Sequence, residues 1–160
     1  MKRRMTGILA VAAGLVLYLH ALAAWPPAIT LEDQYRQAVS LSDVLIEPAV
    51  LVYSDRQGAS QARDWLELLR DQNCVLIEAA NLSSAPAIAR PFVRRRFVNG
   101  TPVLMDWRGE LAEALGFVDD QVNPYLLGAT DRFAHWHGEL TIENSPAYQS
   151  RLEEFCNAVD

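Results

Sequence analysis

Two cysteines and two histidines are the side chains of this 160-residue sequence best suited to redox or metal chemistry. Cys74 and Cys156 lie far apart in the chain, which excludes both a C-x-x-C redox dyad and the close cysteine pairs of a zinc site. Cys74 opens an apolar segment, and Cys156 falls late in a predicted C-terminal helix. Two interpretations stay open, a structural disulfide and two separate buried thiols, and the apolar surroundings favour the second.

The two histidines raise a metal hypothesis. His135 and His137 alternate along a predicted strand, so their side chains share one face and lie about 6–7 Å apart. The sequence identifies no third ligand, and histidines on an edge hairpin are more often solvated or partly buried side chains. We therefore expect no bound metal there.

The start of the chain has the parts of a secretory signal peptide. A basic start, an apolar run and an A-x-A cleavage pattern occupy residues 2–4, 8–19 and 21–23. We expect cleavage after Ala23 or Ala24, one domain over residues 24–160, and a periplasmic or otherwise extracytoplasmic location. The alternative is an uncleaved N-terminal anchor, because the apolar run can be extended to Trp25.

Removal of this leader makes an acidic chain more acidic. The full sequence has a formal charge of −6, and the leader holds three basic residues and no acidic one, so the mature charge is −9. Nucleic acids and anionic membranes attract basic surfaces. We therefore expect neither as a partner, apart from the membrane that an uncleaved anchor would enter.

The hydrophobic patterns that must position these residues predict an α/β domain. Residues 50–53 form a short apolar, β-rich run that is typical of a core strand. From Gly58 onward apolar side chains recur at helical spacing, which predicts an amphipathic helix. A second buried strand over residues 75–77 completes a β-α-β unit, whose strands should run parallel with a right-handed crossover.

The second half of the chain alternates in the same way. We predict a helix over residues 85–97, with an inner face made of Ile88, Phe92, Val93 and Phe97. A strand over 101–105 and a short helix over 110–115, ended by Gly116, come next. Residues 124–127 and 133–137 predict a β-hairpin, and Ser145-Pro146 is a good start for the last helix.

Several segments carry a family resemblance in their order and spacing. Residues 29–34 and 39–43 match the pattern L-x-D-Q…V-S-L-S-D, with Arg36-Gln37 where a turn glycine is usual. Residues 102–116 match a β-α insertion, and residues 122–127 and 137–141 match a closing strand and a glycine before the last helix. Together they resemble the redoxin group of the thioredoxin superfamily, which contains the peroxiredoxins and the TlpA-like periplasmic proteins.

This resemblance covers about residues 28–159 and implies the fold. It implies a thioredoxin-like α/β sandwich with an N-terminal β-hairpin and a redoxin-type β-α insertion. A fainter likeness, carried by residues 81–95, is to the YtfJ-type periplasmic proteins, which are also thioredoxin-like and poor in cysteine.

The resemblance also implies where an active site would lie. A gapless match from Val50 places Gln57, Gly58, Ala59 and Ser60 at the C-x-x-C positions. The family attacks disulfides or peroxides with a thiolate, and neither Gln57 nor Ser60 can form one. We therefore interpret residues 57–60 as a degenerate active-site loop. Its helix start could hold a small anion, although a loop simply capped by Ser60 or Asp55 is the favoured interpretation.

The family's cis-proline is assigned by the resemblance to Pro124. A cis Asn123–Pro124 bond beside the loop would expose the preceding backbone for pairing with an extended peptide. Pro102 is the competing candidate, and we prefer Pro124 because the choice of Pro102 leaves the hairpin over residues 126–136 unexplained. A trans proline at the start of a strand is the structural alternative.

These features together predict an exported thioredoxin-fold protein that has lost its redox dyad. The preferred hypothesis is a non-catalytic binding or accessory module, without a cofactor, that holds a protein or peptide partner at the 57–60 loop and the Pro124 edge. The alternative is a periplasmic thiol oxidoreductase or peroxiredoxin-like enzyme that uses Cys74 or Cys156. A third hypothesis is metal carriage by His135 and His137.

Overall fold

The computed structural model describes residues 25–70, 72–128, 132–136, 138, 141 and 144–157. The predicted signal peptide lies outside these residues. The strands are β1 (Thr30–Glu32), β2 (Ala38–Ser40), β3 (Ala49–Ser54), β4 (Val75–Asn81), β5 (Val103–Asp106), β6 (Val122–Leu127) and β7 (Arg132–His135). The helices are α1 (Leu41–Val44), α2 (Ala59–Leu69), α3 (Arg90–Phe97), α4 (Glu110–Leu115) and α5 (Ser145–Asn157), with a 3₁₀ turn at Ala87–Ala89.

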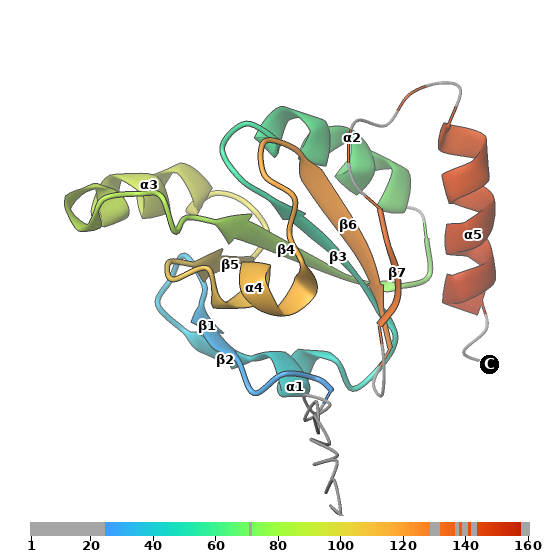
Figure 1. The fold of residues 1–160 in the computed structure, drawn as a ribbon, viewed down its shortest axis with the longest axis horizontal. Coiled ribbons are helices and arrows are strands. Elements are labelled where there is room, and N and C mark those ends of the chain that lie inside the picture. The colour runs from blue at the N-terminus through green and yellow to red at the C-terminus, as the bar shows by residue number, and fades with distance from the viewer. Residues whose placement is uncertain are drawn as a thin grey trace, which may run out of the picture.

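The strands form one mixed sheet in the order β2-β1-β5-β4-β3-β6-β7 (Figure 1). Strand β3 runs parallel to β4 and antiparallel to β6, and β4 runs parallel to β5. The predicted β-α-β unit and the predicted closing hairpin of β6 and β7 are therefore both confirmed. None of the helices in the described part of the chain is long and apolar enough to span a membrane.

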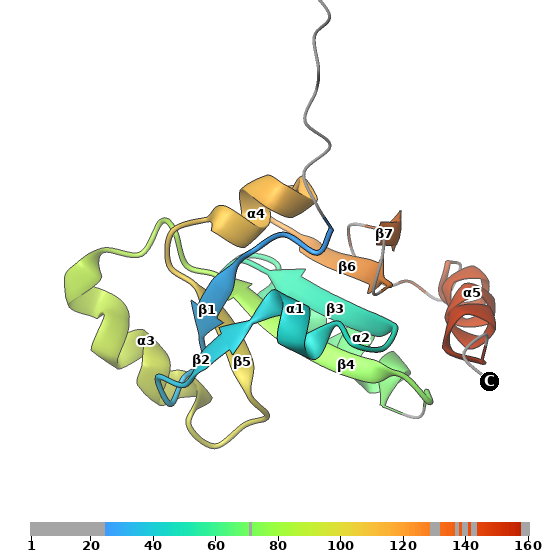
Figure 2. The same cartoon turned by 90° about the horizontal axis from the view of Figure 1, so that it is seen from below.

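Strand β3 lies at the centre because both of its faces are buried. Its first five residues alternate between two core clusters, as expected for an apolar strand that is buried on both faces. Leu51 and Tyr53 belong to the cluster with α1 and α4, whereas Val50 and Val52 belong to the cluster with α2 and α5. Helices therefore cover both faces, with α4 and α2 on opposite sides of the sheet (Figure 2).

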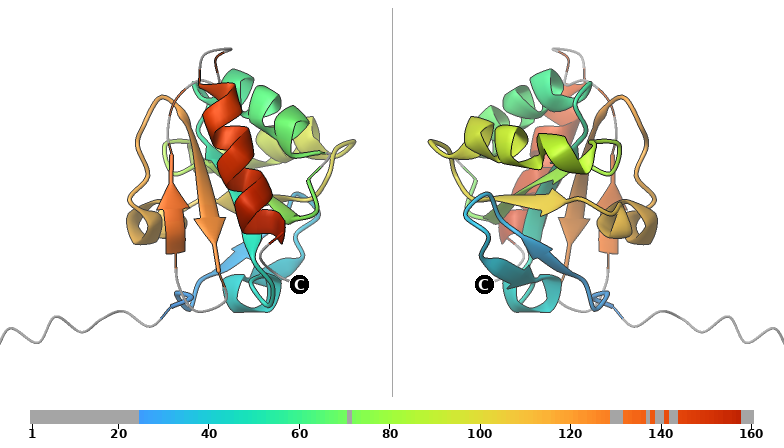
Figure 3. Two further views of the ribbon diagram at one scale, coloured as in Figure 1. Left: turned by 90° about the vertical axis from the view of Figure 1, so that its right-hand side faces the viewer. Right: turned by 90° about the vertical axis from the view of Figure 1, so that its left-hand side faces the viewer.

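Helices α5 and α2 lie on the same face of the sheet (Figure 3), and an aromatic cluster joins them. The ring of Trp65, which is 1% exposed, lies 5.0 Å from the ring of Tyr148 and 6.0 Å from that of Trp136. These contacts hold α5 against the sheet, so side-chain packing helps to determine the position of its last turn.

The N-terminal hairpin of β1 and β2 forms as predicted, and its turn explains the missing glycine. Arg36 takes a φ of 68°, the left-handed region that favours glycine. The carboxylate of Asp33 accepts hydrogen bonds from the backbone N–H groups of Tyr35 and Gln37, each at 2.8 Å. These bonds hold the turn in a conformation that Arg36 alone does not favour.

Helix α3 differs from its prediction. None of its residues is buried, and the side chains of Ile88 and Phe92 are 83% and 66% exposed. The inner face predicted from Ile88, Phe92, Val93 and Phe97 is therefore wrong for Ile88 and Phe92. Figure 1 shows α3 projecting from the body of the fold beyond β5, where it has no sheet face to cover.

Candidate functional site

Residues 57–60 span the junction between β3 and α2. Strand β3 ends at Ser54 and α2 begins at Ala59, so the strand, loop and helix form as predicted. Gln57 and Ser60 are exposed and Gly58 is buried. An anion or substrate that used the start of α2 would have to reach past this glycine.

The chain's own backbone closes that approach. A Cβ atom at position 58 would lie 2.3 Å from the carbonyl carbon of Gln121, so the segment before β6 rests directly on Gly58. Asp55 accepts hydrogen bonds from the N–H groups of Gly58 at 2.8 Å and Asp120 at 2.7 Å. The side-chain oxygen of Gln61 accepts the N–H of Val122 at 3.2 Å. Asp55, one of the two capping residues considered from the sequence, thus holds the loop against the next segment of backbone.

The prediction of a cis-proline groove is wrong. Among the described residues the only cis peptide bond is Trp25–Pro26, so the bonds before Pro124 and Pro102 are trans. Pro124 lies inside β6 opposite Val52, and its carbonyl accepts the N–H of Trp136 at 2.9 Å. Because the N and C=O of one strand residue point to the same side, its missing N–H faces β7 and removes no bond to β3.

Asn123 has a structural role in place of the predicted one. Its side chain is fully buried, accepts the N–H of Val118 at 2.9 Å and donates to the carbonyl groups of Val118 and Gln121 at 2.8 and 3.0 Å. These bonds shape the turn that brings Gln121 onto Gly58. The backbone that faces the loop is thus that of Gln121 rather than that of Pro124.

The two cysteines are joined in a disulfide, with Cα atoms 5.2 Å apart. The favoured interpretation as two separate thiols is therefore wrong, because α5 brings Cys156 back to the start of β4. Cys74 directly precedes Val75, which pairs with Ala49 at the first residue of β3. Since β3 and β4 are parallel, the disulfide lies at the end of the sheet opposite the 57–60 loop.

The surroundings of the disulfide do not favour a reactive thiolate. Cys156 is 4% exposed and lies in the last turn of α5, where the helix dipole is negative. A hollow of about 340 Å³ beside Cys74 is lined by Glu47 and by no described lysine, arginine or histidine. Nucleophilic cysteines instead have cationic neighbours or lie at a helix start.

A buried carboxylate organises the end of the sheet near the loop. Asp106 is fully buried and accepts the phenol O–H of Tyr53 at 2.7 Å. The same carboxylate accepts N–H groups from the first turn of α4, those of Gly109, Glu110, Leu111 and Ala112. Burial, and next the nearby charge of Asp106, raise the pKa of Tyr53 far above its ordinary value. All these groups are satisfied within the protein, so the arrangement is structural.

The arginines of α3 are also partly engaged. The guanidinium groups of Arg90 and Arg94 lie 5.1 and 5.3 Å from the ring centre of Trp107. Arg94 also forms an ion pair with Glu32 and donates to the carbonyl of Asp33. These contacts attach the otherwise unburied helix to the body of the fold.

The metal hypothesis receives no support from the described residues. His135 belongs to β7 opposite Tyr125, and His137 lies outside the described residues. No group of three or more His, Cys, Asp or Glu side chains placed to hold a metal occurs in the described part of the chain.

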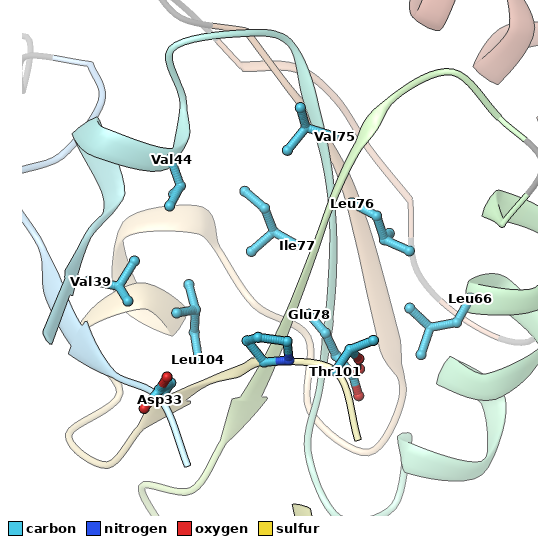
Figure 4. Close-up of a pocket in the computed structure, with 11 residues that line it drawn as sticks. Asp33, Val39, Val44, Leu66, Val75, Leu76, Ile77, Glu78, Thr101 and Leu104 are labelled. Atoms are coloured by element: carbon cyan, nitrogen blue, oxygen red, sulfur yellow. Dashed lines mark hydrogen bonds between the residues drawn. The ribbon is translucent and has the colours of Figure 1, made fainter. Parts of the chain in front are cut away.

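An apolar groove beside the first half of β4 is the feature that sequence reasoning missed. It encloses about 500 Å³ between β4 and the segment of β2 and α1 (Figure 4). Val75 and Leu76 line it and are 38% and 40% exposed, although the sequence predicted them as parts of a buried strand. An apolar run predicts a buried strand, but it does not show that the neighbouring strand β5 pairs only with residues from Glu78 onward.

The sheet order, the helices on both faces and the position of the loop define a class of protein. The chain has the thioredoxin-like fold, with an N-terminal hairpin and a β-α insertion formed by β5 and α4. No protein-family model matches the sequence, and no curated protein matches it in sequence.

Solved structures show the same fold at low sequence identity. The exposed lipoprotein thioredoxin Etrx1 of Streptococcus pneumoniae is 14% identical, with a TM-score of 0.61 over 79% of this chain and 98% of that one. DsbF of Mycobacterium tuberculosis is 14% identical, with a TM-score of 0.58 over 83% and 96%. A thiol peroxidase from Chromobacterium violaceum is 13% identical, with a TM-score of 0.57 over 82% and 86%. At these identities the likeness shows the fold alone.

Proposed function

We propose that this protein is an extracytoplasmic, non-catalytic binding module built on the thioredoxin fold, which holds a segment of a partner protein. One observation carries the proposal. The two cysteines are joined to each other at one end of the sheet, while the loop that would hold reactive thiols lies at the other end, without thiols and covered by Gln121.

The chemistry of both ends supports a role without turnover. A thiol exchange cycle needs an accessible thiolate, and the 57–60 loop offers an amide and a hydroxyl instead. Asp55 and Gln61 use their oxygens on the backbone of residues 58, 120 and 122, so the loop has no free base for Ser60. Binding needs only a shaped surface, which the groove beside β4 supplies.

The disulfide supports the proposed compartment. Disulfides persist in oxidising compartments such as the periplasm and are rare in the cytosol. A Cys74–Cys156 bond therefore agrees with the signal peptide predicted from residues 1–23.

Two assays on the purified protein test this proposal. Reduction of insulin by dithiothreitol and consumption of hydrogen peroxide should proceed at the same rate with the wild type and with the Cys74→Ala/Cys156→Ala double variant. The immobilised wild type should also retain a partner from a periplasmic extract. Turnover that the wild type supports and the double variant lacks would contradict the proposal.

Thiol–disulfide exchange through Cys74 and Cys156 is the second candidate. Cys74 is half-buried and opens onto the hollow of about 340 Å³, and the structures with the same fold include a thiol peroxidase. This candidate requires a disulfide that cellular dithiols reduce. Equilibration with glutathione buffers separates the two candidates. A structural disulfide has a reduction potential below about −300 mV and stays oxidised in these buffers, whereas a catalytic one has a higher reduction potential and becomes reduced.

A further inference from the structure

Strand β4 has an unpaired stretch of backbone inside the sheet. It pairs with β3 from Val75 to Ala80, whereas β5 joins it only from Glu78 onward. Among the described residues, Val75, Leu76 and Ile77 therefore have a neighbouring strand on one side only. The N–H and C=O groups of this stretch that face away from β3 can pair with an added strand.

The unpaired stretch opens onto the groove described above. Figure 4 shows Val39, Val44 and Leu104 across the gap from β4, with Ile77 pointing toward them. Leu76 points to the other face, toward Leu66 of α2. Apolar side chains thus flank the unpaired backbone on both faces of the sheet. The side chains of an added strand alternate between these two faces, so both sets would meet apolar surface.

Carboxylates mark one end of the groove. Asp33 and Glu78 both line it, and no described lysine, arginine or histidine does. Desolvation by burial raises the pKa of Glu78, and its contact with the Thr101 hydroxyl offsets part of that rise. A cation placed beside Glu78 would favour its ionised form and so offset this effect of burial.

We propose that this groove binds an extended segment of a partner protein, which adds as a short strand to residues 75–77, with apolar side chains in the groove and a lysine or arginine beside Glu78. The inference rests on the proposed binding function and names its site and the chemistry of its partner.

The position of the gap within the sheet selects this occupant. Strands β5, β1 and β2 lie beyond β4 in the sheet order, so the gap is internal and is not a free outer edge. A second folded copy would need an outer edge to pair its own sheet. A small apolar molecule would fill the groove but leave the backbone groups of residues 75–77 unpaired.

The first test uses capped synthetic hexapeptides that alternate valine and threonine and carry a lysine at one end or the other. We expect one lysine peptide to bind about tenfold more tightly than the same peptide with glutamate. N-methylation of its alternate amides should weaken binding about tenfold, because strand addition depends on main-chain hydrogen bonds. In hydrogen exchange, the bound peptide should slow at least one amide among Val75, Leu76 and Ile77.

A matched pair of variants locates the site. Leu76→Glu places a charge in the groove at a side chain that is 40% exposed, and Ile46→Glu changes a side chain that is 75% exposed and does not line it. Leu76→Glu should weaken peptide binding at least about tenfold and Ile46→Glu should leave it unchanged. Circular dichroism checks that both variants fold, and Val44→Glu replaces Leu76→Glu if that variant does not.

Four outcomes would overturn the inference. The first is that no peptide binds, and the second is that Leu76→Glu binds the peptide as tightly as the wild type does. The third is that N-methylation leaves the affinity unchanged. The fourth is that the protein forms a concentration-dependent dimer that Leu76→Glu abolishes. A fifth outcome, a partner captured equally by wild type and Leu76→Glu, would overturn the groove as the binding site but leave the proposed binding function standing. Redox turnover that depends on the cysteines would instead overturn the proposed function.

Discussion

The two ends of the β3–β4 pair differ in what they leave accessible. At the carboxyl ends of these strands, Gly58 is covered by Gln121, and Asp55 and Gln61 bind the adjoining backbone. At the opposite end a disulfide fixes α5, and three residues of β4 have no strand partner on one side. The end at which the redoxin resemblance would place an active site is closed, and the opposite end is open.

The two ends thus differ in accessible surface, as the proposed binding function requires. At the loop end, Asp55 and Gln61 hydrogen-bond to the adjoining backbone, which stabilises the domain. The β4 end leaves backbone groups and apolar side chains exposed, which is costly unless a partner covers them. Four predictions test this comparison by changing one end at a time.

The disulfide should contribute most to stability. It closes a loop with a sequence separation of 82, so loss of both thiols in Cys74→Ala/Cys156→Ala should lower the free energy of unfolding by about 4 kcal/mol. Urea denaturation measures this loss. Dithiothreitol should destabilise the wild type by a similar amount and leave the double variant unchanged. A double variant as stable as the wild type would show that packing alone holds α5.

Gly58→Ala tests the closure of the loop end. The added Cβ would meet the backbone of Gln121 at 2.3 Å, so one of the two segments must move, and we expect a loss of about 3 kcal/mol by urea denaturation. Gly100→Ala is the matched control, because its Cβ would meet only the Phe97 carbonyl at 3.6 Å, and it should change stability by less than about 0.5 kcal/mol. Equal stability of the two variants would mean that the loop is open.

Much of the fold was predictable from local pattern. The apolar run of β3, the helical spacing of α2 and the glycine that ends α4 each identify their element without tertiary information. The left-handed φ of 68° at Gly116 is the helix end that its sequence position indicated. The helices have one buried face each, which periodicity detects, and β3 is identified by its continuous apolar run.

The predictions that failed concern residues whose positions depend on contacts between segments far apart in the sequence. Ile88 and Phe92 are apolar at helical spacing, but α3 is attached through Arg90 and Arg94 to Trp107, so their burial could not follow from periodicity. Pro124 lies three positions beyond Gln121, the residue that faces the loop, and only the path of the chain reveals this. The Cys74–Cys156 pairing depends likewise on where α5 returns to the sheet.

Tyr53→Phe tests the buried carboxylate at the loop end. It leaves Asp106 buried without the O–H donor at 2.7 Å, and we expect a loss of about 2 kcal/mol in the free energy of unfolding. Tyr35→Phe removes an exposed O–H that donates to the Val98 carbonyl, and it should cost less than about 1 kcal/mol. Equal losses of stability in Tyr53→Phe and Tyr35→Phe would mean that the hydrogen bond to the buried Asp106 contributes no more than an exposed one.

Glu78→Gln tests the groove end through pH. The pKa of Glu78 in the folded protein is raised above 4.5, so the folded state holds this proton more tightly than the unfolded state does. The wild type should therefore lose stability relative to Glu78→Gln as pH rises through 4.5 and the folded pKa. At pH 7 the variant should be more stable by less than about 1 kcal/mol, because water reaches the carboxyl in part. A stability difference that does not change between pH 3 and pH 7 would contradict the desolvation of Glu78.

Hydrogen exchange of the free protein tests the contrast between the two ends most directly, because one experiment reports on both. We predict slow exchange for the N–H groups of Gly58 and Val122, which Asp55 and Gln61 accept, and fast exchange for at least one N–H among residues 75–77. Slow exchange throughout residues 75–77, together with fast exchange at Gly58 and Val122, would contradict this account.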